Sequence, residues 1–294
     1  MTDPVLELFD RRITAADLAS PPHLLPAGAT VAAARRALRE RGFDTTPVPS
    51  ASRGLRRIDP ALLAAAADDA PVAACTVAVV AEARLEPGAP LPAVLEALRR
   101  EPFLVVCGDG SEATAGRADG SSVVGVITRR DLDRPVVGLA VLGLIVRCER
   151  HLDVLIDRAA RHVGGWEALL PPERAAKLAG VRAYLRRPGY DLGPMSTLNL
   201  DDRLTLVAKL PALRAALGWP SRASFRRFAE PLRRMRDAIA HGGGVLRAVP
   251  DPLEALAVVF ELRAFVDRVE ALVASGWEPV PAVPAPELGE PLEP

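Results

Sequence analysis

Apolar residues follow two different patterns along the chain. Up to residue 134, helical spacing alternates with short continuous apolar runs, such as the buried strand predicted at 103–106 and its predicted partner at 123–128. From residue 136 onward the spacing is helical. Glycines and prolines separate five predicted helices, at 136–163, 172–187, 200–217, 222–241 and 252–275. The pattern predicts the α+β class, with a mixed N-terminal part followed by an all-α helical bundle.

The mixed part contains an internal repeat. Ala29 and Ala89 begin equivalent segments 60 residues apart, and each segment leads into a helical pattern and then into strands. Thr30 is placed to cap the first of these helices. We therefore predict two β-α-β-β-α units, at about 10–70 and 75–134, within a domain that occupies residues 1–134.

Three stretches of this repeat resemble a tandem pair of CBS domains. They are "LASPPHLLPAGATVAAARRALRERGFDTTPV" in the first unit, and "LEPGAPLPAVLEALRREPFLVVCGDG" and "VVGVITRRDL" in the second. The last stretch matches the family signature G-h-h-[ST]-x-x-D, where h is apolar. The resemblance implies that Thr128, Asp131 and Arg129 contact the phosphate and ribose of an adenosine nucleotide, which would be a regulatory ligand.

The same residues have a second interpretation. Thr128 and Asp131 have the S/T-x-x-D spacing of a helix capping box, which would be used without any ligand. The equivalent stretch of the first unit, residues 54–60, lacks this spacing, and Pro60 falls where its helix is expected to begin. If one nucleotide binds, the second unit is the better candidate.

The predicted helix at 222–241 has the strongest local charge in the helical part. Its residues 222–236 carry six arginines against the single acid Glu230, and four of these arginines are predicted to bind RNA phosphates: Arg226, Arg227, Arg233 and Arg234. His241 ends this helix before three glycines. A helix C-terminus stabilises a positive charge, so His241 is a candidate proton donor.

Residues 135–277 resemble a HEPN domain, an all-helical unit whose active members are metal-independent ribonucleases. The stretches that carry the likeness are "LIVRCERHLDVLI", "LTLVAKLPALRAALGW" and "FRRFAEPLRRMRDAIAHGG". The family motif, Arg, a polar residue, three more residues and His, falls on Arg236, Asp237 and His241. The resemblance implies a homodimer in which two Arg/His pairs line one cleft, and catalysis that needs no metal or other cofactor.

The chemistry of such a site follows from its residue types. His241 would transfer a proton or hold the leaving oxygen, Arg236 would stabilise the charged transition state, and Asp237 would orient its neighbours. The RNA products would carry 2′,3′-cyclic phosphate ends. Five helical residues turn about 500°, which leaves Arg236 and His241 roughly 140° apart. We therefore expect His241 to leave the helical path, as the three glycines would permit.

Two functions remain open at this point. The first is a CBS pair that senses an adenosine nucleotide and regulates a dimeric ribonuclease, in stress response, as a toxin or in phage defence. The alternative is non-enzymatic: a ligand-binding regulatory or scaffold protein whose helical domain only dimerises or binds RNA or a partner. Arg236, Asp237 and His241 would then serve only as surface ion pairs and a helix cap.

Overall charge neither supports nor excludes an RNA partner. Basic and acidic residues both number 37, yet residues 135–277 carry 19 Arg and 2 Lys against 15 Asp and Glu, a net charge of +6. Residues 278–294 hold six Pro and four Glu and are predicted to be a disordered tail. The longest apolar run has 11 residues, too few for a membrane span of about 20. Three widely spaced cysteines fit a cytoplasmic protein without disulfides or a zinc site.

Overall fold

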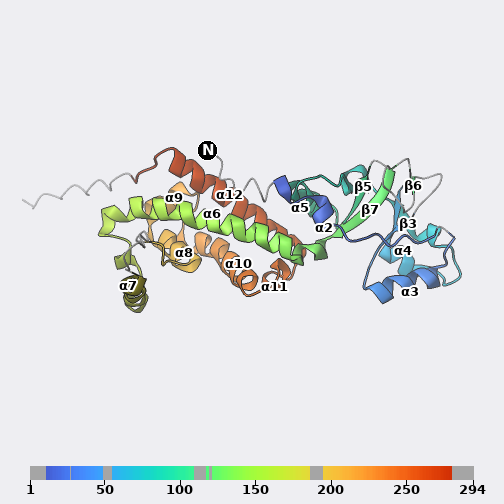
Figure 1. The fold of residues 1–294 in the computed structure, drawn as a ribbon, viewed down its shortest axis with the longest axis horizontal. Coiled ribbons are helices and arrows are strands. Elements are labelled where there is room, and N and C mark those ends of the chain that lie inside the picture. Colours follow the sequence, from blue (N-terminus) through green and yellow to red (C-terminus); the bar gives the residue numbers. More distant parts are fainter. Residues whose placement is uncertain are drawn as a thin grey trace, which may run out of the picture. The chain divides into compact units, whose positions relative to one another are not determined.

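The structure of the protein is a computed structural model that describes residues 11–26, 28–48, 55–108, 117–118, 121–185 and 195–279. The chain forms two compact units (Figure 1). The first comprises residues 1–143 and 242–256, and the second comprises residues 144–241 and 257–294. The division falls inside helix α6, nine residues after the predicted boundary, because residues 242–256 pack with the first unit. Most of the predicted tail, from residue 280 on, lies outside the described residues.

The first sheet of the first unit has three antiparallel strands in the order β1 (Pro47–Val48), β2 (Arg56–Ile58) and β3 (Thr76–Ala78). Its helices are α3 (Val31–Arg41), α4 (Pro60–Ala65) and the 3-10 helix η1 (Val72–Cys75). Thr30 caps α3 as predicted, since its hydroxyl accepts from the Ala33 amide at 3.3 Å. Pro60 begins α4 without disturbing it, because the first helical position has no amide bond to lose and Asp59 caps the helix.

The second sheet has the order β4 (Arg84–Leu85), β5 (Phe103–Gly108), β7 (Ser121–Thr128) and β6 (Arg117–Ala118). Strands β5 and β7 confirm the predicted antiparallel pair, whereas β4 and β5 are parallel. The remaining elements are η2 (Ala81–Ala83), α5 (Leu91–Arg100), η3 (Arg129–Asp133), α2 (Ala15–Leu18) and α11 (Val245–Ala248). The helix expected to close this unit is therefore only a five-residue 3-10 turn, η3.

The two halves of the repeat exchange segments. The N-terminal segment pairs with the second sheet through a bridge between Ser20 and Val126, although it belongs to the first half in sequence. In return, β3 comes from the second half and pairs with β2 of the first sheet. Gly125 of β7 permits the first contact, because a Cβ at this position would lie 2.5 Å from the Cβ of Ala19. The predicted units at 10–70 and 75–134 therefore do not separate in space.

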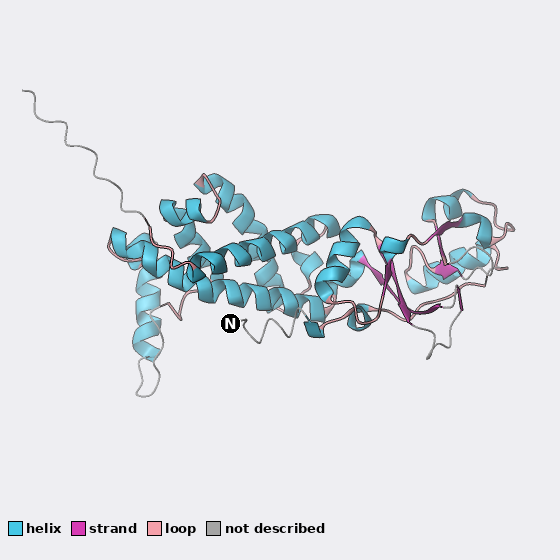
Figure 2. Cartoon of the chain, turned by 90° about the horizontal axis from the view of Figure 1, so that it is seen from above, coloured by secondary structure: helices cyan, strands magenta, loops and turns pink. Residues whose placement is uncertain are grey.

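Among the described residues, the second unit is entirely helical and every strand belongs to the first (Figure 2). Its helices are α6 (Pro135–Ala160), η4 (Arg161–Val163), η5 (Glu167–Leu169), α7 (Pro172–Leu185), α8 (Leu200–Lys209), α9 (Pro211–Ala216), α10 (Arg222–Ala240) and α12 (Pro252–Ala274). The first nine residues of α6 and the first five of α12 belong to the first unit. The helix predicted at 200–217 is divided into α8 and α9, because Pro211 has no amide hydrogen to continue α8. Within the described residues, no helix combines the length and apolar character needed to cross a bilayer.

Charged pairs join α6 to its neighbours inside this unit. The Arg203 guanidinium of α8 donates to both Asp153 oxygens, at 2.7 and 2.9 Å, and its side chain is only 7% exposed. Arg147 pairs with Glu270 of α12, and His151 Nε2 lies 3.2 Å from the same carboxylate. The structure places His151 in a half-buried layer of ion pairs between helices.

Candidate functional site

Helix α10 separates an apolar face from a basic one. Its buried residues are Phe225, Phe228, Ala229, Leu232 and Met235, at the spacing of one helical face. Ser221 caps the helix, since its hydroxyl accepts from the Ser224 amide at 3.0 Å. Burial of this face leaves most of the arginines of α10 in contact with solvent: Arg222, Arg226, Arg227 and Arg234 are exposed.

A groove of about 520 Å³ lies between the N-terminal half of α10 and helix α8. Its charged and hydroxyl side chains are Asp201 and Thr205 of α8, and Arg222, Arg226, Arg227, Glu230 and Arg233 of α10. The predicted phosphate contacts Arg226, Arg227 and Arg233 thus lie together, joined by Arg222. Arg234 is exposed on the same helix but is not among these lining residues.

The arginines of the groove are not equivalent. Arg233 lies 2.5 Å from an oxygen of Asp201 and 3.7 Å from one of Glu230, so its charge is already balanced. Arg222, Arg226 and Arg227 form no ion pair with the described residues. Three cations therefore remain available to an anionic ligand, and phosphate is the common ligand that a cluster of arginines fits best.

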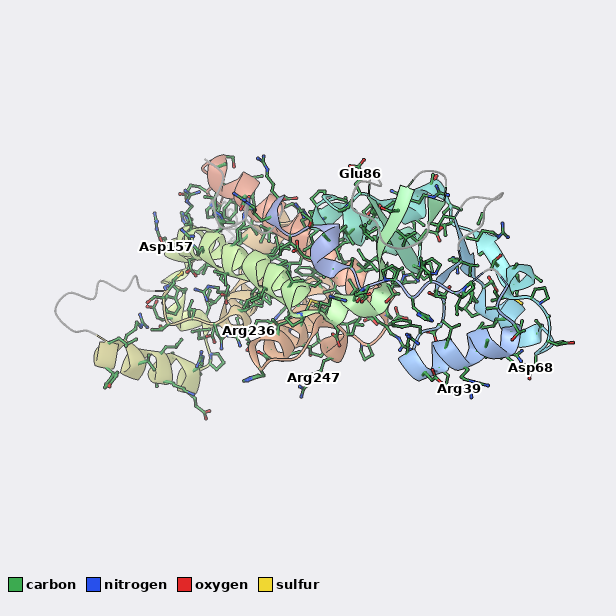
Figure 3. All side chains as sticks on the ribbon, turned by 45° about the vertical axis from the view of Figure 1, so that its right-hand side comes forward. Arg39, Asp68, Glu86, Asp157, Arg236 and Arg247 are labelled. Carbon is green, nitrogen blue, oxygen red and sulfur yellow. The ribbon has the colours of Figure 1, made fainter. Side chains whose placement is uncertain are left out.

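The Arg/His motif lies at the other end of α10 (Figure 3 labels Arg236). Arg236 Nη1 donates to the Asp237 carboxylate at 3.0 Å, which brings these two predicted residues together. The exposed side chain of His241 forms no hydrogen bond or ion pair with the described residues. His241 is the C-cap of α10, with φ of −98° and ψ of 20°, and its backbone amide donates to the Asp237 carbonyl at 3.1 Å, so the helical path ends at this residue. Within the described part of the chain, however, no hydrogen bond joins its side chain to Arg236, so the expected pairing of the two residues stays a prediction.

The glycines that follow His241 have other roles. Gly242 adopts a left-handed conformation with φ of 76°, which ends α10 just after the histidine. Gly244 is extended and lies so close to Asp133 that a Cβ would meet the carboxylate at 2.0 Å. The Asp133 carboxylate in turn accepts from the Leu246 amide at 2.7 Å. The glycines therefore end the helix and seat the next segment.

Glu149 of α6 is a nearby acid that sequence reasoning did not single out. Its Oε1 lies 3.5 Å from Arg203 Nη1, and its side chain is 20% exposed. Burial raises the pKa of the Glu149 carboxyl, while the Arg203 and Arg236 cations act in the opposite direction. Arg236 therefore lies within electrostatic reach of α6, which its sequence position did not reveal. Among the described residues, no group of three or more His, Cys, Asp or Glu is placed to hold a metal ion.

The predicted nucleotide site in the first unit forms a closed set of contacts. Asp131 Oδ2 accepts from the Thr128 amide at 2.7 Å and from the Thr128 hydroxyl at 2.9 Å, so the capping interpretation is confirmed. Arg134 occupies the other carboxylate oxygen at 2.8 Å and also donates to the Ser20 hydroxyl at 2.6 Å. Arg129 does not point to an open site, because it donates to the Leu98 and Arg99 carbonyls at the end of α5.

A second turn of the same kind escaped the sequence analysis. Thr14 and Asp17 repeat the contacts of Thr128 and Asp131, with distances of 2.7 Å to the amide and 3.0 Å to the hydroxyl. The signal was present, since the letters I-T-x-x-D-L begin at Ile13 and again at Ile127. Both turns belong to the second half of the repeat in space, because the N-terminal segment joins the second sheet.

Comparison with known proteins finds similarity only at the level of solved structures. No protein-family model matches the sequence, and no curated protein matches it. A CBS domain-containing protein of unknown function from Bacillus anthracis is 18% identical, covers 42% of this chain and 91% of its own, and has a TM-score of 0.34. The CBS domain of a bacterial CNNM/CorC family Mg²⁺ transporter in complex with ATP is also 18% identical, over 47% and 92%, with a TM-score of 0.34.

A third similar structure is CBSX2 in complex with AMP, at 18% identity over 44% of this chain and 96% of that one. Its TM-score is 0.32. All of these scores lie below 0.5 and all identities below 25%. The description of the first unit therefore rests on its own strand order, segment exchange and Thr-x-x-Asp turns.

Proposed function

We propose that the chain is a nucleotide-responsive RNA-binding protein whose helical unit cleaves RNA. One observation carries the proposal: α10 bears a groove with three arginines that form no ion pair with the described residues and, at its end, the exposed His241 and the Arg236–Asp237 pair. Arg226 and His241 are 15 residues apart, which is about 22 Å along a helix. A single RNA strand held by its phosphates along α10 would reach the histidine.

The cleavage step needs only the RNA and side chains of this chain. The 2′-oxygen attacks the adjacent phosphorus and forms a new P–O bond while the bond from phosphorus to the 5′-oxygen breaks. Protonated His241 gives its proton to the departing 5′-oxygen, and water accepts the proton of the 2′-hydroxyl. Arg236, held by Asp237, stabilises the extra negative charge on the phosphoryl oxygens. The products are a 2′,3′-cyclic phosphate and a 5′-hydroxyl.

On an ideal helix Arg236 and His241 would lie about 140° apart. Among the described residues no hydrogen bond joins their side chains. We propose that a second copy of the chain completes the site, with Arg236 of one copy and His241 of the other facing the same phosphate. Such a site would exist only in the homodimer. Activity per chain should then rise with protein concentration until dimerisation is complete.

The test is cleavage of mixed cellular RNA by the wild type and by the variants His241→Ala and Arg236→Ala. Each variant should lose a factor of about 10² to 10⁴ in rate, the usual contribution of a positioned proton donor. His162→Ala and Arg39→Ala are matched controls at exposed positions, and they should cleave as the wild type does. Equal cleavage by all five proteins would remove the assignment. RNA in which deoxyribose replaces ribose at the cut position should resist.

The lack of a hydrogen bond between Arg236 and His241 within the described residues also favours a second candidate function, a non-enzymatic regulator that binds RNA without cutting it. In that case the arginine groove would be the functional surface, and His241 would only end its helix. Saturable RNA binding with no cleavage in the presence or absence of adenosine nucleotides would favour this candidate. No RNA binding under low-salt conditions would exclude both.

For the first unit, we propose an adenosine nucleotide as the regulatory ligand, held at the turn of Thr128 and Asp131. The Asp131 carboxylate lies beside the backbone at the end of β7, where it accepts from Thr128 and Arg134. The oxygen that Arg134 contacts can accept one further hydrogen bond. AMP and ATP are suitable first probes. Asp131→Asn keeps the shape of the turn and should weaken binding at least tenfold, whereas Asp17→Asn in the equivalent turn should not. Equal binding by both variants and the wild type would place the ligand elsewhere.

A further inference from the structure

A second cavity, of about 490 Å³, shares Arg227 with the arginine groove. Its walls come from the segment that follows α9, from α10 and from α12, all within the helical unit. The side chains that matter for its chemistry are Trp219, Arg227, Phe228, Glu261 and Arg268. The cavity thus combines aromatic rings, two cations and one acid, and none of these features is needed for the cleavage step.

Trp219 is held firmly in this cavity. Its ring centroid lies 5.2 Å from that of Phe225, 4.8 Å from that of Phe228 and 5.3 Å from that of Phe265. Two of the three contacts are edge-to-face arrangements, which are favourable for aromatic pairs. The ring is nevertheless only half-buried, so part of it remains at the surface. A rigid and partly open indole is well suited to stacking, because little conformational entropy is lost when a ligand binds.

Arg268 lies over Trp219. Its guanidinium carbon is 4.8 Å from the ring centroid, within the range of a cation–π contact. Arg268 is exposed, and a planar guanidinium that stacks on one side can accept a second planar group on the other. Unpaired RNA bases stack on such guanidinium planes as well as on aromatic rings. Trp219 and Arg268 therefore form a ready-made stacking platform.

The stacking platform adjoins the arginine groove. Arg227 lines both cavities, so a strand whose phosphates lie on Arg222, Arg226 and Arg227 passes the mouth of the second cavity. Glu261 is exposed at this cavity and carries two oxygens that accept hydrogen bonds. An acid would repel a phosphate, but it suits the amino and imino N–H groups on the edge of a base.

We propose that this cavity binds one unstacked base of a single-stranded RNA, with the base on the Trp219–Arg268 pair and its N–H groups donating to Glu261. The inference rests on the proposed RNA binding and adds a preference for single strands, since a paired base cannot enter. Duplex RNA would engage only the arginines of the groove and should bind more weakly than a single strand of equal length.

The experiment uses Trp219 itself as the reporter. The chain has three tryptophans, so the double variant Trp166→Phe, Trp277→Phe leaves Trp219 as the only one. Titration with a 12-residue single-stranded oligoadenylate should quench its emission. An oligonucleotide of the same length without bases should bind at low salt, detected by anisotropy, yet should leave the emission unchanged.

Arg268→Lys separates stacking from charge, because lysine keeps the cation and loses the planar group. The variant should bind the single strand at least about 5-fold more weakly, the lower end of the contribution of one stacked base. Its affinity for the base-free oligonucleotide should equal that of the wild type. If RNA binds but quenching is absent and Arg268→Lys has no effect, the base site is refuted while RNA binding stands. If neither oligonucleotide binds, the proposed function itself fails.

Discussion

The salt dependence of RNA binding gives a quantitative test of the arginine groove. The informative change is Arg226→Gln, which removes one unpaired charge and keeps a side chain of similar length. Its counterpart is Arg233→Gln, which removes a charge that Asp201 and Glu230 already balance. Both arginines lie on the same helix and line the same groove. The two variants therefore differ mainly in whether the lost cation was available to a phosphate.

The expected magnitude follows from the number of available cations. For single-stranded nucleic acid, the logarithm of the binding constant falls with the logarithm of salt concentration with a slope of about −0.7 for each neutralised phosphate. Three unpaired arginines predict a slope of about −2.1, or a loss of roughly 18-fold in affinity between 50 and 200 mM salt. Arg226→Gln should reduce the slope to about −1.4 and the loss to roughly 7-fold. Arg233→Gln should leave the slope near −2.1.

Fluorescence anisotropy of a labelled single-stranded RNA at four salt concentrations measures these slopes. Arg39→Gln, at an exposed position of α3 in the first unit, controls for a change in net charge alone. An unchanged slope for Arg226→Gln would contradict the placement of phosphates in the groove. If the slope changes more for Arg233→Gln than for Arg226→Gln, the Arg233 guanidinium is available to phosphate in solution, and its ion pairs with Asp201 and Glu230 do not hold it.

Three further predictions concern stability. Arg203→Met leaves the Asp153 carboxylate without its cation and should cost about 3–5 kcal/mol of unfolding free energy. Urea unfolding followed by tryptophan emission measures this, because all three tryptophans lie in the helical unit, and a loss below about 1 kcal/mol would contradict it. Burial raises the pKa of Glu149 above its ordinary 4.5, so the folded state holds this proton to higher pH than the unfolded state does, and stability falls as pH rises through that window. Glu149→Gln should flatten this fall at pH values above 4.5 in thermal unfolding, and parallel wild-type and variant curves would refute the role of burial. Gly125→Ala would bring two Cβ atoms to 2.5 Å across the contact with Ala19 and should cost about 1–3 kcal/mol, seen as a lower melting temperature by far-UV circular dichroism; unchanged melting would contradict the close approach.

Local features of the fold were predictable because local chemistry determines them. The helix predicted at 222–241 is observed as α10 at Arg222–Ala240, since its apolar spacing, its Ser221 cap and the following glycine all agree. The same holds for the β5 and β7 pair. The division at Pro211 was equally local and could have been predicted from the missing amide hydrogen.

Features that depend on distant partners were not predictable from one sequence. Nothing near Ser20 indicates that its partner is Val126, because strand pairing leaves no local signal when the segment is short. Arg129 was expected at a ligand, yet its guanidinium reaches carbonyls at the end of α5, 30 positions earlier in the chain. For the candidate site, the sequence located Arg226, Arg227 and Arg236 correctly on one helix.

Tertiary contacts determine which arginines of the groove form ion pairs and which do not. Arg233 and Arg227 look alike in the sequence, and only the packing of α8 against α10 brings Asp201 to one of them. The acids Glu149 and Glu261 could not be recognised from the sequence, because each comes from a different helix that packs near α10 only in the fold. The Arg/His motif could be found from letters alone, but the direction of His241 required the backbone.

The exchange of segments in the first unit has a consequence for the order of events during synthesis. Ser20 leaves the ribosome 106 residues before Val126, its partner in β7. At usual elongation rates the N-terminal segment therefore waits roughly 5 to 20 s before its place in the sheet exists. The first half cannot complete its own sheet either, because β3 is supplied by the second half. The nascent chain thus keeps a strand edge open until both halves are made, and an open strand edge is a place where nascent chains can associate wrongly.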